Sequence, residues 1–276
     1  MPEPVVAGAP DGEPDVGPDP ALVAALVTAL RGAGCVFAEE EAALLAELPA
    51  PERAAALSRR VAGEPLEHVL GWAELAGVRV AVGPGVFVPR RRTEALVAQA
   101  QRLLTPDGVL LDLCCGSGAV ARVLAERCRP ARVHASDVDA AAVAVAAVNL
   151  AGLGTVSVAD VVDGVPPDLR GAVTVLTANV PYVPTRELDL LPRDVREHEP
   201  RFTHDGGADG LDLLRRVLAD AATWLAPGGV ALSEVAPHQV GAALEAAHAV
   251  GLVPWCAVDD ERDVAVLLAR RRTDAP

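Results

Sequence analysis

The chain has 276 residues, of which 51% are hydrophobic, and a formal net charge of −14 at pH 7. This composition is typical of a globular protein and excludes an intrinsically disordered one. Because an acidic surface repels a phosphate backbone, the charge also argues against direct binding of nucleic acid.

The first 20 residues are rich in proline and acidic side chains and contain no basic residue. Residues 1–20 cannot bury enough apolar surface to fold, so we expect a disordered acidic tail. The start of the chain lacks the basic and apolar regions of a secretion signal, and the five cysteines have neither disulfide nor metal-site spacing. We therefore expect a cytoplasmic protein with no membrane segment and no metal.

Residues 21–70 contain leucines at helical spacing, as at Leu22, Leu26 and Leu30. Glycine and proline pairs separate three such segments. The pattern predicts a small N-terminal helical domain.

The helical period disappears over residues 71–92, where apolar residues alternate on both sides of Gly83-Pro84-Gly85. This alternation predicts a β-hairpin linker with strands at residues 78–82 and 86–89. Thr93 follows the linker and is a candidate cap for the next helix.

From residue 93 to residue 276, segments typical of strands and of helices alternate. The alternation predicts an α/β domain, in which a doubly wound, mostly parallel sheet carries helices on both faces. We expect strands at residues 109–113, 132–136, 155–159, 172–178, 230–235 and 264–268. We expect helices at residues 94–104, 119–127, 140–150, 211–225 and 239–250.

The strand at residues 109–113 leads directly into Cys114-Cys115-Gly116-Ser117-Gly118, and a helix follows at once. Gly116 and Gly118 can adopt positive φ angles and carry no side chain, so a ligand can approach the backbone where the helix begins. A tight turn is the alternative interpretation of this pair of glycines.

Three of the expected strands end in or beside an aspartate, namely Asp112, Asp137 and Asp160. Because the carboxyl ends of parallel strands meet at one edge, these side chains should line one crevice, where such sheets bind nucleotides. Helix capping explains each aspartate singly but not the set. Ala121 replaces the third glycine of a dinucleotide site, and the carboxylates would repel a diphosphate. The sequence therefore favours S-adenosylmethionine over NAD.

The tetrapeptide Asn179-Val180-Pro181-Tyr182 follows the apolar strand at residues 172–178. It contains the only tyrosine of the chain and one of its two asparagines. Asparagine and proline are also common where a strand passes into a turn. Composition alone does not separate this interpretation from a functional one.

Several of these motifs together resemble a known family. The stretch at residues 112–119 is similar to the first motif of class I S-adenosylmethionine-dependent methyltransferases, and residues 179–182 resemble the Asn-Pro-Pro-Tyr motif of amino-methyltransferases. Four further stretches carry a more specific resemblance, to the release factor glutamine methyltransferases of the HemK/PrmC type. They are residues 63–71, 88–94, 199–201 and 206–212. The similarity runs in order from about residue 63 to residue 270.

The resemblance implies a seven-stranded, Rossmann-like methyltransferase domain behind a helical domain and a hairpin. It implies methyl transfer from S-adenosylmethionine to the side-chain amide of the glutamine in the Gly-Gly-Gln loop of a peptide chain release factor. The implied cofactor-binding residues are Asp112, Cys114, Cys115, Gly116, Ser117, Gly118 and Asn179, with Asp137 at the ribose and Asp160 and Val161 at the adenine. The implied substrate-binding residues are Asn179, Val180, Pro181 and Tyr182, and Asn179, Pro181 and Tyr182 are the implied catalytic residues.

The chemistry of the tetrapeptide suits this role. Asn179 and the backbone carbonyl of Val180 would accept both N–H bonds of the substrate amide and aim its lone pair at the methyl group. Pro181 turns the preceding carbonyl away from any helix, and Tyr182 offers a flat wall for a planar amide.

The chain departs from the family in two places, because Val180 and Arg91 stand where the family has proline. Two alternatives stay open: a nucleic-acid amino-methyltransferase that acts on adenine N6 or guanine N2, and a catalytically silent binding module. The basic cluster Arg90 to Arg92 is either a substrate contact or a solvated edge. We expect a monomer whose partner is a release factor, without direct nucleic-acid contact.

Overall fold

The computed structural model describes residues 18–273, and the chain divides into two compact units between Glu64 and Pro65. Most of the expected acidic tail, residues 1–17, lies outside the described residues. Asp19 belongs to the first helix instead, because its carboxylate accepts a 2.9 Å hydrogen bond from the Ala21 N–H and caps the helix start.

The first unit is a bundle of three helices, as predicted, and its helices are α1 (Pro20–Gly32), α2 (Ala38–Ala46) and α3 (Ala50–Val61). Leu26, Leu30 and Leu45 form its buried interior. A paired contact of Arg60 with Glu41, at 2.7 and 3.0 Å, joins α3 to α2. Such bidentate geometry is the strong form of an Arg–carboxylate pair.

The second unit opens with the short helix α4 (Leu66–Leu70) and a β-hairpin of β1 (Trp72–Leu75) and β2 (Val78–Ala81). The hairpin was predicted, but its strands were misplaced by one strand length. The turn is Ala76-Gly77, where both residues have positive φ, as a two-residue hairpin turn requires. The expected strand at residues 86–89 is not a strand.

A seven-stranded sheet forms the centre of the second unit, in the spatial order β5-β4-β3-β6-β7-β9-β8. β9 alone runs opposite to the other six strands of this sheet, so the predicted doubly wound, mostly parallel α/β fold is confirmed. The strands are β3 (Val109–Leu113), β4 (Arg132–Asp137), β5 (Thr155–Val158), β6 (Val173–Ala178), β7 (Leu225–Val235), β8 (Val253–Asp259) and β9 (Val264–Arg270).

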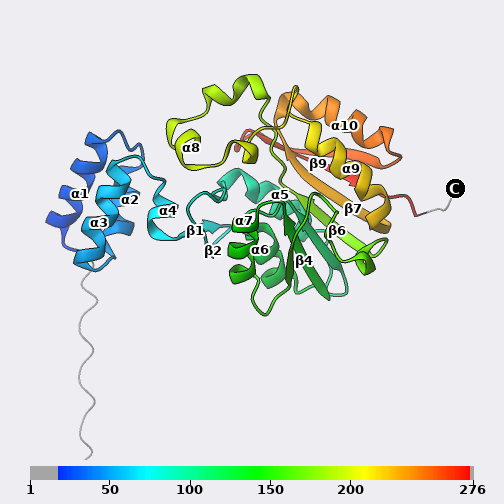
Figure 1. Cartoon of the computed structure of the whole chain (residues 1–276), viewed down its shortest axis with the longest axis horizontal. Helices are drawn as coiled ribbons and strands as arrows, with labels where there is room; N and C mark the ends of the chain where they lie inside the picture. The colour runs from blue at the N-terminus through cyan, green and yellow to red at the C-terminus, as the bar shows by residue number, and fades with distance from the viewer. Residues whose placement is uncertain (1–17, 274–276) are drawn as a thin grey trace, which may run out of the picture. The chain divides into compact units, whose positions relative to one another are not determined.

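Helices cover both faces of this sheet (Figure 1). The larger ones are α5 (Glu94–Gln101), α6 (Ala119–Cys128), α7 (Ala140–Asn149), α9 (Asp212–Trp224) and α10 (Val240–Ala249), and α8 (Arg193–His198) is short. Successive side chains of β3 point to opposite faces of the sheet. Leu110 therefore packs with α5 and α6 on one face, and Leu111 packs with α9 and α10 on the other. No helix among residues 18–273 is long and apolar enough to cross a membrane.

Strand β8 was not predicted from the sequence. Pro254 interrupts its apolar pattern, and proline inside a run argues against a strand unless the strand lies at an edge. β8 is the last strand in the sheet order, so it pairs on one side only, with β9.

The strand order creates the crevice in which the sequence placed a ligand. From β3 the chain moves outward to β4 and β5, and then returns to β6 on the other side of β3. The segments that follow β3 and β6 therefore diverge at a topological switch point, the usual ligand position in open α/β sheets.

Asn149, at the end of α7, holds the hairpin against the glycine loop. Its Oδ1 accepts from the Ala81 N–H at 2.8 Å, and its Nδ2 donates to the carbonyls of Ala81 and Ser117 at 2.9 and 2.8 Å. One buried side chain thus satisfies three backbone groups on two segments.

Replacing Asn149 with alanine should lower the free energy of unfolding by about 3 kcal/mol, because buried backbone groups lose their partners. Urea unfolding of the full chain measures the difference. Gln99→Ala, which removes an amide from the half-buried surface of α5, is the control and should change stability by less than about 0.5 kcal/mol. Equal effects in the two variants would contradict the bridging role.

Candidate active site

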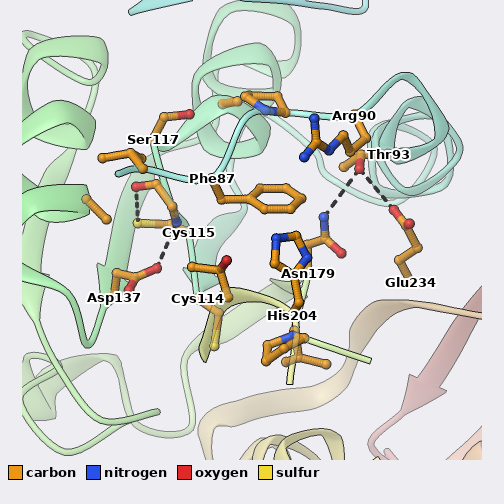
Figure 2. A pocket seen from close by; sticks show the side chains of 18 of the residues that line it. Phe87, Arg90, Thr93, Cys114, Cys115, Ser117, Asp137, Asn179, His204 and Glu234 are labelled. Atoms are coloured by element: carbon orange, nitrogen blue, oxygen red, sulfur yellow. Dashed lines mark hydrogen bonds between the residues drawn. The ribbon is translucent and has the colours of Figure 1, made fainter. Parts of the chain in front are cut away.

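A cavity of about 480 Å³ lies at the carboxyl ends of β3, β4 and β6. Its size is within the range of small-molecule sites. Of the residues expected at the cofactor and substrate sites, it is lined by Asp112, Cys114, Cys115, Gly116, Ser117, Asp137, Asn179, Val180, Pro181 and Tyr182. Figure 2 shows how the side chains from these distant segments converge.

The glycine loop has the conformation that its sequence predicted. Gly116 and Gly118 have φ angles of 54° and 74°, and Cys114 also lies in the left-handed region at 52°. The Gly116 N–H donates to Asp137 Oδ2 at 2.8 Å, which joins the loop to the end of β4. A Cβ atom on Gly116 would meet nothing within 4 Å, so this part of the loop is open to a ligand.

Gly118 is required for packing, and its contact with the cofactor stays a prediction. It is not among the residues that line the cavity, and a Cβ atom there would lie 3.0 Å from the Cβ of Ala146. The absence of a side chain therefore lets the start of α6 pack closely against α7.

The carboxylates of Asp112 and Asp137 both line the cavity but differ in their surroundings. Burial raises the pKa of Asp112 to about 7, although the Thr177 hydroxyl and the Ala121 N–H donate to it at 2.7 and 3.2 Å. Burial also raises the pKa of Asp137, and the N–H groups of Asp139 and Gly116 offset part of that rise. Asp112 thus joins β3 to β6 and α6, whereas Asp137 organises the glycine loop.

Asp160 and Val161, which the family resemblance places at the adenine, lie outside the residues that line the cavity. Asp160 is exposed and pairs with Arg216 at 2.9 Å, and the Val161 side chain is buried. Their contact with the adenine stays a prediction.

The tetrapeptide lies where β6 ends, and all four of its residues line the cavity. The Val180 side chain is only 2% exposed and packs in the apolar cluster that contains Leu211 and Leu214. The Tyr182 carbonyl accepts from Gln239 Nε2 at 2.9 Å, and a Cβ atom on Gly210 would lie 2.2 Å from that same carbonyl oxygen. Burial and close backbone packing therefore fix the course of the tetrapeptide.

Two residues of the site, Thr93 and Glu234, were not predicted to belong to it. Thr93 is the residue before α5, but its side chain makes no capping bond. Its hydroxyl contacts Asn179 and Glu234 instead (Figure 2). A lone carboxylate within the apolar run of β7 was the available signal for Glu234, because buried acids occur mainly where they are paired.

A second buried acid, Glu199, orders the rim of the cavity. Its carboxylate accepts from Arg90 Nη2 at 2.5 Å, from His204 Nε2 at 2.8 Å and from the Val88 N–H at 3.4 Å. The ring centroids of His204 and Phe87 are 5.6 Å apart. Burial alone would raise the pKa of Glu199, but the His204 hydrogen bond and the Arg90 charge outweigh it, and the pKa lies below its ordinary value.

The basic cluster therefore divides into different roles. Arg90 binds Glu199, and Arg92 Nε lies 3.8 Å from Glu234 Oε1 at the cavity wall. Arg91 is exposed. The two arginines that line the cavity thus face buried carboxylates.

Cys114 and Cys115 are not suited to nucleophilic chemistry. Burial, and after it the neighbouring aspartates, raises the pKa of both thiols, so they remain protonated at neutral pH. They act as small apolar residues of the loop.

These residues fit S-adenosylmethionine. The acidic side chains of Asp112, Asp137 and Asp139 line the cavity and suit a cation better than a diphosphate. The open backbone at Gly116 admits a ligand at the start of α6, and Asp137 retains acceptor capacity for ribose hydroxyls beside its two backbone donors.

Comparison with known proteins gives the family. Residues 77–184 match the methyltransferase small domain family. A release factor glutamine methyltransferase of Moorella thermoacetica is 41% identical over 201 residues, which is 71% of this chain and 70% of that protein. The chain belongs to the release factor glutamine methyltransferase family. It is an S-adenosylmethionine-dependent methyltransferase, as its motifs predicted, and the alternative of a silent binding module is set aside.

Two other similar proteins carry different names: one is a relative in sequence, and the other shares the fold at low sequence identity. A Streptomyces pristinaespiralis protein named 4-amino-L-phenylalanine/4-methylamino-L-phenylalanine methyltransferase is 35% identical over 66% of this chain and 64% of its own length. The crystal structure of a Pyrococcus furiosus methyltransferase shares the fold, with a TM-score of 0.55 at 15% identity over 71% of this chain and 90% of its own.

Replacing Asp137 with alanine should weaken S-adenosylmethionine binding at least about tenfold, because both the carboxylate and the order of the glycine loop are lost. Isothermal titration calorimetry on the full chain measures the change. Asp160→Ala removes the aspartate after the next strand and is the matched control, with a smaller expected effect. An equal loss of S-adenosylmethionine affinity in both variants would show that Asp160 also contributes to the cofactor site.

Glu199→Gln should lower the free energy of unfolding at pH 7 by about 2 kcal/mol, because charge-assisted bonds to Arg90 and His204 are lost. The pKa of Glu199 is lowered in the folded state, so its stabilisation is present above the ordinary value of 4.5 and is lost as the pH falls through the folded-state pKa. The difference between variant and parent in thermal unfolding should therefore shrink below pH 4.5.

The control for this measurement is Glu197→Gln in α8, two residues before Glu199, because the ion pair of Glu197 with Arg193 is exposed. Exposed pairs contribute little to stability. A stability difference for Glu199→Gln that stays constant down to acid pH would exclude the charge as its cause.

Proposed function

We propose that the chain methylates the side-chain amide nitrogen of a glutamine in a peptide chain release factor, the activity named for its relatives. The observation that carries the proposal is the position of Asn179, Val180 and Tyr182 on the wall of the cavity that also contains the glycine loop. The acceptor pair for an amide and the residues expected at the cofactor thus share one space.

The two acceptors are the Asn179 side-chain oxygen and the Val180 backbone carbonyl. Within the described residues, no backbone or side-chain donor bonds to the Val180 carbonyl. Pro181 keeps that carbonyl out of a helical direction and has no N–H of its own to compete. An amide NH₂ group that donates one hydrogen to each acceptor is held with its nitrogen lone pair directed out of its plane.

Orientation is the main contribution that these residues make. S-adenosylmethionine, when bound, supplies an activated methyl group, so that the new N–C bond forms as the S–C bond breaks, the sulfur keeps the electron pair and an amide proton is released. An amide nitrogen is a weak nucleophile, since its lone pair is delocalised into the carbonyl. Holding it in line with the methyl group can lower a barrier by roughly 7 to 11 kcal/mol in favourable cases.

The substitution of valine for the family's proline leaves this clamp in place. A proline would fix the backbone through its ring. Val180 instead buries its side chain in the cluster around Leu211 and Leu214, and this packing restrains the same backbone. Acceptance of an amide is therefore compatible with Val180.

A protein substrate is favoured over nucleic acid by charge. The chain has a net charge of −14, and five acidic residues line the cavity, namely Asp112, Asp137, Asp139, Asp194 and Glu234. A phosphate backbone would be repelled by such a surface. We propose that the chain acts as a monomer on release factors in the cytoplasm, where translation takes place.

The test is incubation of the full chain with methyl-labelled S-adenosylmethionine and an unmodified release factor, followed by peptide mapping. Label should appear on the glutamine of the Gly-Gly-Gln loop. Asn179→Ala should lower kcat about a hundredfold or more, because the amide loses its orienting acceptor, while calorimetry should show cofactor affinity close to that of the parent.

Asp137→Ala provides the matched contrast, since it should weaken cofactor binding instead. Label on another side chain or on a nucleic-acid base would sink the proposed substrate, as would preference for a small aromatic amine. Near-normal turnover by Asn179→Ala would refute the amide clamp itself.

A further inference from the structure

A chain of buried hydrogen bonds leads from β7 to the substrate clamp. Glu234 is 2% exposed and accepts from two hydroxyl groups, that of Thr93 at 2.9 Å and that of Tyr182 at 2.8 Å. Thr93 is equally buried, and its oxygen accepts from Asn179 Nδ2 at 3.3 Å. The dashed lines in Figure 2 follow this path from Glu234 through Thr93 to Asn179.

The direction of the hydrogen bond between Thr93 and Glu234 fixes the direction of the next one, between Thr93 and Asn179. An ionised carboxylate only accepts hydrogen bonds, whereas a hydroxyl has a single proton to donate. Thr93 gives that proton to Glu234, so its oxygen can only accept from Asn179. Asn179 must then present its NH₂ group to Thr93, and its Oδ1 is turned the other way.

We propose that Glu234 is a positioning residue, which acts through Thr93 to fix the polarity of the Asn179 amide so that Asn179 offers an acceptor to the substrate. The opposite orientation would present an NH₂ group to the substrate NH₂, and two donors repel each other. Burial raises the pKa of Glu234. The hydroxyls of Tyr182 and Thr93, and after them the Arg92 guanidinium, whose Nε lies 3.8 Å from Oε1, favour the charged form and offset part of that rise. The same carboxylate accepts a hydrogen bond from the Tyr182 hydroxyl. One group therefore positions both Asn179, through Thr93, and the Tyr182 ring.

This inference rests on the proposed function, because the benefit of an acceptor depends on a substrate that donates. Its structural content, the orientation of Asn179, can be measured without any substrate. The two parts are therefore tested separately.

Glu234→Gln is the most direct variant, because it keeps the shape of the side chain and changes its hydrogen-bonding character. Arg92 and Tyr182 both lie beside Oε1, so the glutamine carbonyl should take that place and its NH₂ group should face Thr93. Thr93 then accepts from Gln and turns its own proton toward Asn179, which reverses the path. We expect kcat to fall about a hundredfold, with cofactor affinity within about twofold of the parent.

Thr93 supplies a second pair of variants. Thr93→Val removes the hydroxyl at similar size and should lower kcat by a similar factor, whereas Thr93→Ser keeps the hydroxyl and should restore most of the activity. Glu126→Gln, on the solvent side of α6 where Glu126 pairs with Arg122, is the control for the Glu-to-Gln change. Circular dichroism and thermal unfolding show whether each variant is folded.

The orientation of Asn179 is observable by NMR, because the chain contains only two asparagines. Selective ¹⁵N labelling of asparagine gives two side-chain NH₂ groups, and Asn179→Ala assigns them. Glu234→Gln and Thr93→Val should shift the Asn179 signals and speed their exchange with water. The Asn149 signals should stay in place, since all three partners of Asn149 are backbone groups.

Unmoved Asn179 signals in both variants would overturn the inference, and so would shifted signals with a kcat equal to that of the parent. Loss of activity in Thr93→Ser equal to that in Thr93→Val would also overturn it, because the hydroxyl would then not be the active feature. If the parent chain leaves the release factor unlabelled while the signals shift as expected, the proposed substrate fails and the polarity path stands.

Discussion

A buried hydrogen bond between two neighbouring strands aligns the whole site. The Thr177 hydroxyl of β6 donates to Asp112 of β3 at 2.7 Å, and these two residues are direct partners in the parallel register. The same register places Leu113 beside Ala178, so the glycine loop and the tetrapeptide leave the sheet side by side. A shift of one residue would turn alternate side chains to the opposite face and separate the two.

Buried acids recur as the points where distant segments are joined. Asp112 joins β3 to β6 and α6, Glu199 joins the segment before α5 to the rim after α8, and Glu234 joins β7 to Thr93 and Tyr182. A buried carboxylate is costly unless donors surround it. Each buried carboxylate therefore stabilises the packing of segments that brings its hydrogen-bond donors together. This packing fixes the positions of the residues that line the cavity.

The local features of this chain were predictable because they depend on residues close in sequence. The apolar alternation of β3, the glycines of its loop and the helical periods of α6 and α9 are such features. The hairpin was predicted at the wrong position, because a short turn that contains Ala76 carries a weak local signal. Strand β8 was missed, because Pro254 weakens its strand pattern. The ligand approach predicted at Gly118 stays a prediction, whereas the close packing of Gly118 against Ala146 on another helix was not predicted.

The sequence by itself determined the fold class, the family, the cofactor and the tetrapeptide that lines the cavity, because periodicity and compact motifs record local geometry. Only the tertiary structure decided that Thr93 supports Asn179 instead of capping a helix, that Asp160 lies outside the cavity lining, and that Val180 is held by burial. Contacts such as Thr93 to Glu234 and Arg90 to Glu199 join residues 141 and 109 positions apart. No local pattern encodes such pairs, since their partners meet only when the sheet has assembled and its buried charges have found donors.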